Sequence, residues 1–95
     1  MMDPQIEFQG IECQDFRQKA KDLMEDLIQL CPSDSTVTAT FRFIQNKFVT
    51  EIKVASESVY MQVLDQASVM TDVLDHVKTS LLSQIVDWRN HRFAS

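Results

Sequence analysis

Residues 37–63, with the sequence VTATFRFIQNKFVTEIKVASESVYMQV, contain the pattern that decides the fold. Polar and apolar side chains alternate through most of this stretch, which is typical of strands that bury one face. If the chain turns tightly at Gln45 and Asn46, the apolar side chains of the two flanking strands lie on the same face. Phe43 then pairs with Phe48. The pattern therefore predicts an antiparallel hairpin.

A second tight turn would extend this hairpin to three strands. We place this turn at Ser56 and Glu57, which makes Val54 the partner of Val59. The third strand then also points its apolar side chains to the shared face. Because both turns give the same buried face, the sequence predicts a three-stranded meander.

Three further elements surround the meander. Residues 5–9 alternate like a short strand, and residues 13–30 repeat apolar side chains at helical spacing before Pro32. Helical spacing returns over residues 68–89, where Trp88 is expected to be buried at the end of the apolar stripe. The order predicts one α+β domain spanning residues 1–95, β-α-β-β-β-α, with two helices packed on one face of a four-stranded sheet. The first two strands are expected to be parallel.

Length and composition restrict the class of protein. The chain has 95 residues, of which 44% are hydrophobic and 24% charged, as in an ordinary globular domain. No apolar run is long enough to span a membrane, and the first residues do not resemble a secretory signal. Cys13 and Cys31 flank the first expected helix, too far apart for a disulfide. We therefore expect a cytoplasmic protein with reduced thiols and no membrane contact.

The sequence gives no support for an enzyme. Gly10 is the only glycine, which excludes the glycine-rich loops that hold phosphates. Asp72 and His76 lie one helical turn apart, but no third metal ligand is within sequence reach. No cysteine or serine is placed beside a histidine in a way that predicts a nucleophile. We expect no catalytic residues, no metal and no cofactor.

The last expected helix and the first carry residues in a recognisable pattern. The residues are Met70, Leu74, Asp75, Leu81, Gln84, Ile85, Trp88 and Arg89, together with Arg17. In these residues and in its order of elements, the chain resembles the short ribosome hibernation promoting factor family. This family is also called ribosome-associated inhibitor or sigma-54 modulation proteins. The resemblance implies a stress-response factor that binds the small ribosomal subunit through basic helices and restrains translation.

If this function holds, the cations of the two helices contact ribosomal RNA. The candidate RNA-binding residues are Arg17, Lys21, Lys78, Arg89 and Arg92. The formal net charge of the chain is nevertheless −5, which argues against a large non-specific nucleic-acid surface. Ser80, Ser83, Val86 and Asp87 also stand where the family usually has basic residues.

These departures favour an alternative hypothesis, in which a relative with the same fold has lost RNA binding. Such a protein would act as an interaction or dimerisation module, with a protein partner or a second copy. On the face of the sheet opposite the helices, the candidate interface residues are Arg42, Val49, Lys53, Tyr60 and Leu64. The expected register places Val49 beside Leu64, and Lys53 beside Tyr60. On the last helix, the candidates are Leu82, Val86 and Phe93, which we expect to face away from the core.

Overall fold

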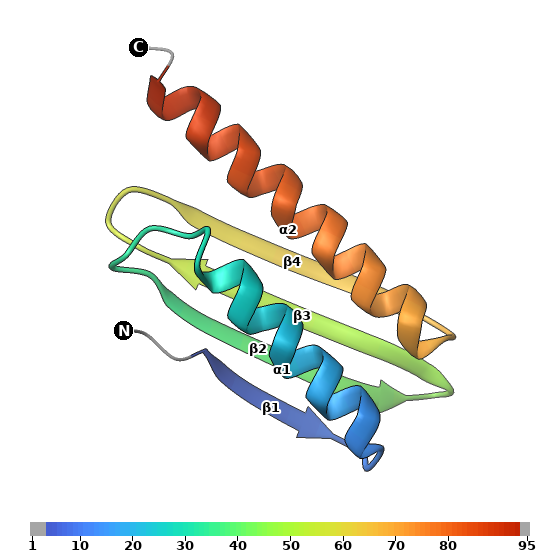
Figure 1. Ribbon diagram of the computed structural model, residues 1–95. Coiled ribbons are helices and arrows are strands. Elements are labelled where there is room, and N and C mark those ends of the chain that lie inside the picture. Colours follow the sequence, from blue (N-terminus) through green and yellow to red (C-terminus); the bar gives the residue numbers. More distant parts are fainter. Residues whose placement is uncertain (1–3, 94–95) are drawn as a thin grey trace.

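The computed structural model describes the backbone of residues 4–93 and the side chains of residues 4–90. The elements follow the expected order. They are β1 (Gln5–Gln9), α1 (Gln14–Ile28), β2 (Thr36–Ile44), β3 (Lys47–Ala55), β4 (Tyr60–Ala67) and α2 (Met70–Phe93). Figure 1 shows both helices on one face of the sheet, running in the same direction. The predicted α+β architecture is therefore confirmed.

The four strands form one sheet in the order β1-β2-β3-β4. β1 pairs with β2 in parallel, as the strand–helix–strand connection predicts, and the other two pairs are antiparallel. β1 and β4 are consequently the two edges. Figure 1 shows α1 lying over the β1–β2 side of the sheet and α2 over β4.

The β2–β3 hairpin has the predicted register. Phe43 lies opposite Phe48, and Val37 lies opposite Val54. The two turn residues adopt positive φ angles, 52° at Gln45 and 63° at Asn46. Two consecutive residues with positive φ form a two-residue turn whose twist matches that of the two strands it connects.

The predicted β3–β4 register is wrong by two residues. Val54 lies opposite Met61, not Val59, because the turn spans four residues, 56–59. Ser56 closes this longer loop. Its backbone N–H donates to the carbonyl of Val59 at 2.9 Å, and its Oγ accepts the N–H groups of Ser58 and Val59. Hydrogen bonds to the Ser56 side chain stabilise this longer turn, which therefore does not need the left-handed residues that a two-residue turn requires. Side-chain faces are unchanged, because the shift is an even number of residues.

The core lies between the helices and the sheet. Its largest fully buried side chains include Phe16 and Met24 from α1, Phe41 and Ile52 from the sheet, and Leu81 from α2. The Phe16 ring meets the Phe41 ring edge-on, with centroids 5.7 Å apart. These contacts fix the position of α1 over the parallel strand pair.

Two residues of α2 differ from their predicted burial. Trp88 is half-buried rather than buried, because α2 continues past the end of the strand that it covers. Leu82 was expected to face away from the core, but it is half-buried and packs against it. Val86 has the predicted exposure, with 51% of its surface accessible. No helix in the part of the chain that the structure describes is both long and apolar enough to cross a bilayer.

Candidate functional site

The two candidate cations of α1 differ in their surroundings. Arg17 is half-buried, and its Nε donates a 2.9 Å hydrogen bond to the carbonyl of Ile11. Its guanidinium also lies over the ring of Phe8, 5.3 Å from the centroid, so Arg17 faces the β1 edge. Lys21 follows one helical turn later and is exposed. This flank of α1 therefore carries two cations at the edge of the sheet. The guanidinium of Arg17 is held by contacts within the protein, whereas Lys21 is exposed to solvent.

Lys78 and Arg89, the described candidate cations of α2, lie on the flank of that helix that faces α1. An Nη of Arg89 donates to the carbonyl of Leu30, just after α1, at 3.4 Å. Lys78 is exposed and lies three turns before Arg89 on the same helical flank. Arg92 and Phe93 belong to the last turn of α2, and their side chains lie outside the described residues.

The four described cations do not form a single cluster. Arg17 lies at the beginning of α1 and Arg89 lies beside its end, about 20 Å apart by helical rise. Acidic side chains lie between these positions. They are Asp22, Glu25 and Asp26, all exposed on α1. Phosphate contacts would therefore be spread along the helix layer rather than gathered at one place.

The outer face of the sheet carries the most exposed large apolar side chains. Leu64 is 67% accessible and Tyr60 is 59% accessible, and both lie on β4. The corrected register places Glu51, not Val49, opposite Leu64. Val49 nevertheless lines the same small pocket as Leu64, together with Arg42, another of the candidate interface residues.

The predicted pairing of Lys53 with Tyr60 is also wrong. Lys53 lies opposite Gln62, and Tyr60 lies opposite Ala55. The ammonium group of Lys53 instead lies 3.8 Å from a carboxylate oxygen of Glu51 on the same face. This error follows directly from the two-residue shift in register.

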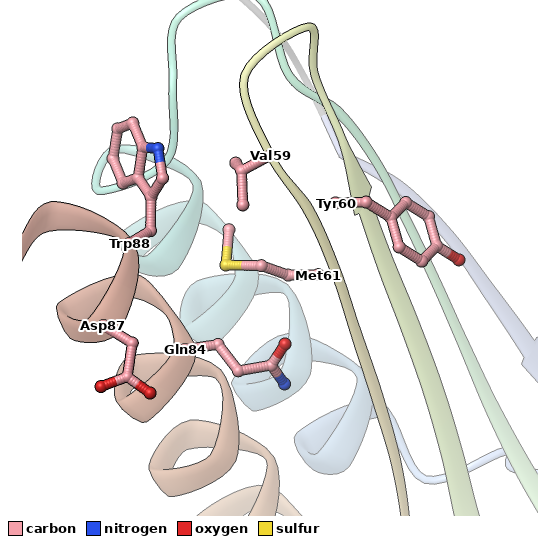
Figure 2. Close-up of a pocket in the computed structure, with 6 residues that line it drawn as sticks. All are labelled: Val59, Tyr60, Met61, Gln84, Asp87 and Trp88. Atoms are coloured by element: carbon pink, nitrogen blue, oxygen red, sulfur yellow. The ribbon is translucent and has the colours of Figure 1, made fainter. Parts of the chain in front are cut away.

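A groove that the sequence did not reveal lies between β4 and the end of α2. It has a volume of about 410 Å³ and is lined by Val59, Tyr60, Met61, Gln84, Asp87 and Trp88. Figure 2 shows Val59, in the turn before β4, and Met61, on β4, pointing toward the helix, while the Tyr60 ring points away to the other face. Helical periodicity predicts which side of a helix faces the sheet, but it does not predict where the helix leaves the sheet.

The Cys31 thiol lies close enough to Arg89, near the end of α2, to feel its charge. Burial raises the pKa of Cys31, and the positive charge of Arg89 offsets part of that rise. The thiol also donates a long hydrogen bond of 3.5 Å to the carbonyl of Leu27. Cys31 therefore remains a protonated thiol at neutral pH, which suits a packing residue better than a nucleophile. Among the described residues, no three His, Cys, Asp or Glu side chains gather as a metal site would require.

Comparison with known proteins yields matches in structure alone. No protein-family model and no curated protein matches the sequence. A ribosomal subunit interface protein from Coxiella burnetii superposes with a TM-score of 0.72 at 15% identity, covering 93% of this chain and 98% of its own. The N-terminal domain of Protein Y from Thermus thermophilus superposes with a TM-score of 0.60 at 13% identity, covering 84% of this chain and 96% of its own. The chain therefore has the fold of these two proteins, as its last helix suggested.

Proposed function

We propose that this chain is a ribosome-associated factor of the cytoplasm that binds the small ribosomal subunit and restrains translation. One observation carries the proposal. Nearly the whole chain superposes on nearly the whole of a ribosomal subunit interface protein, so the likeness extends to both helices and all four strands. A fold hosts many functions, so the identity of the surface that meets the ribosome must come from this chain's own residues.

The cations of the helix layer are the residues that we propose for RNA contact. Lys21, Lys78 and Arg89 are exposed, and Arg92 follows three residues after Arg89 in the sequence of α2. Arg17 donates one N–H to the carbonyl of Ile11, but a guanidinium has five N–H donors, so others remain for a phosphate. The binding is expected to be weak and salt-sensitive, because few cations are available and acidic residues lie among them.

Sedimentation with purified ribosomal subunits tests this proposal. At low salt, the chain should pellet with small subunits and remain in the supernatant with large ones. Raising the salt concentration should release it, because phosphate contacts depend on counterion release. Failure to pellet with small subunits at low salt would contradict the proposal.

A second candidate function is self-association through the outer sheet face, as a protein-interaction module. Leu64, with 67% of its surface accessible, supports it, because large exposed apolar residues are typical of binding surfaces. If two copies meet through this face, Leu64→Lys should lower the apparent mass in light scattering at micromolar concentration. Val69→Lys is the matched control, since it adds the same charge at an exposed aliphatic position outside the sheet. A monomer at all concentrations would exclude this function.

A further inference from the structure

The outer face of the sheet holds a small pocket that is lined by both a cation and a carboxylate. The pocket has a volume of about 60 Å³ and is lined by Thr40, Arg42, Val49, Glu51 and Leu64. Both helices lie on the opposite face of the sheet, so none of the described elements covers the pocket (Figure 1). A surface that carries both charges beside aliphatic side chains can complement a second copy of itself.

The two charged groups of the pocket are not paired with each other. Within the part of the chain that the structure describes, the exposed side chain of Arg42 makes no ion pair or hydrogen bond. Glu51 has one ion pair, in which the ammonium group of Lys53 lies 3.8 Å from a carboxylate oxygen. A carboxylate has two oxygens with several acceptor sites, so Glu51 can also accept from a guanidinium. Arg42 therefore lacks a counterion that Glu51 of another copy can supply.

The positions of Arg42 and Glu51 in the sheet determine how two copies can meet. Arg42 lies opposite Val49, two residues from Glu51 on β3, so Arg42 and Glu51 are diagonal neighbours on the outer face. We consider a two-fold axis that lies between two facing sheets and bisects the line from Arg42 to Glu51 at a right angle. This axis places Arg42 of each copy over Glu51 of the other. With the ordinary spacing of strands and residues, the two sheets then cross at roughly a right angle, which is one of the two common arrangements of packed sheets.

The same axis brings together two aliphatic side chains that played no part in choosing it. Leu64 on β4 and Ile44 on β2 both belong to the outer face, with 67% and 48% of their surfaces accessible. Leu64 lies opposite Glu51, and Ile44 lies opposite Lys47. With the same spacings, rotation about the axis brings Leu64 of one copy close to Ile44 of the other, whereas Tyr60 falls beyond the β1 edge. Charge and apolar surface therefore select the same arrangement.

We propose that two copies of this chain pack their outer sheet faces together about this axis. Arg42 of each copy pairs with Glu51 of the other, and Leu64 of each copy packs beside Ile44 of the other. The inference rests on the second candidate function, self-association through the outer sheet face, and specifies its geometry. It does not depend on ribosome binding, because the helix layer lies on the opposite face of each sheet (Figure 1).

Exchange of the two charges tests the axis. In light scattering at micromolar concentration, the unmodified chain should have twice the mass of one chain. Arg42→Glu should be monomeric, because it places carboxylates over each other, and Glu51→Arg should be monomeric because it places guanidinium groups over each other. An equimolar mixture of the two variants should recover the doubled mass, since both contacts of the mixed dimer then join opposite charges. Recovery would also show that both variants are folded.

The aliphatic contact gives a second readout. Ile44→Lys should lower the mass as Leu64→Lys does. Tyr60→Lys should leave the dimer intact, although Tyr60 is more exposed than Ile44. Lys21→Glu is the matched control for Arg42→Glu, because it makes the same change in net charge at an exposed position of α1, on the other side of the sheet. This control should remain dimeric.

Three results would overturn the proposal. A monomer for the unmodified chain at all concentrations would exclude self-association itself, while leaving the proposed ribosome binding untouched. A dimer that survives both Arg42→Glu and Glu51→Arg would show that the copies meet elsewhere. Two variants that stay monomeric when mixed would show that these two groups do not face each other across the axis.

Discussion

The side-chain amide of Gln84 donates a 2.8 Å hydrogen bond to the backbone carbonyl of Gln62. Gln84 lies on α2, and Gln62 lies on β4, the edge strand of the sheet. The bond occupies a backbone acceptor that would otherwise be open to another strand, and it ties the helix to the sheet edge. Gln84 is also one of the residues on which the sequence resemblance rests, and this contact gives it a structural role.

Gln84→Glu should lower the free energy of unfolding by about 1 kcal/mol, because a carboxylate cannot donate to the Gln62 carbonyl. Urea unfolding measures the change. Gln66→Glu is the matched control, since it makes the same substitution at an exposed position of β4. Equal losses in the two variants would show that added charge, rather than the lost hydrogen bond, is responsible.

Thr50→Val should stabilise the protein by about 1 kcal/mol. Thr50 is 1% accessible, and its Oγ1 has no hydrogen-bond partner among the described residues. Burial of an unpaired hydroxyl is unfavourable, and valine has nearly the same shape without that group. Thr40→Val, on the other face of the sheet, should change the stability little. Destabilisation by Thr50→Val in urea unfolding would indicate that the hydroxyl has a partner in solution.

Cys31 should react with iodoacetamide more slowly than Cys13 near pH 8. Burial raises the pKa of the Cys31 thiol, which lowers its thiolate fraction, and also limits the access of the reagent, whereas Cys13 is exposed. Arg89→Ala should slow Cys31 further, because removing the nearby positive charge raises the pKa of the thiol again. Lys78→Ala serves as the control. Mass spectrometry of the labelled peptides gives both rates, and faster labelling of Cys31 than Cys13 would refute the assignment.

The raised pKa of Cys31 also predicts how stability depends on pH. The folded protein keeps this proton at a pH where the unfolded chain, with its ordinary thiol, has lost it. The stabilising contribution is therefore fully present below the unfolded pKa. It is lost as the pH rises toward and through the folded pKa. Urea midpoints measured from pH 7 upward should fall in the alkaline range, and Cys31→Ala should reduce that fall.

The β2–β3 hairpin was predictable because its turn has two residues and every pair follows from that length. The β3–β4 turn was not, because its length depends on the side chain of Ser56, which bonds to the loop backbone. Alternation could not detect the mistake, since a shift of two residues keeps every side chain on its face. Only the neighbours on the sheet changed, including those of Lys53 and Tyr60.

The site was less predictable than the fold for a similar reason. A helical wheel places Arg17 on a flank of α1, but it does not show that the guanidinium lies over Phe8. It also predicts Trp88 as a continuation of the buried stripe, although the stripe is covered only as far as the sheet extends. The groove depends on the relative lengths and positions of α2 and β4, which are properties of tertiary structure rather than of local pattern.

Binding to purified small ribosomal subunits, measured as a function of salt concentration, is the most direct test of the proposed function. We compare the unmodified chain with Arg89→Ala/Arg92→Ala and with the control Lys47→Ala/Lys53→Ala, which removes two cations from β3. The unmodified chain should bind at low salt. The helix variant should bind more weakly, with a salt slope lower by up to about two units, at roughly 0.9 per lost phosphate contact. The control should match the unmodified chain. Absence of binding at low salt, or the same slope in all three proteins, would contradict the proposal.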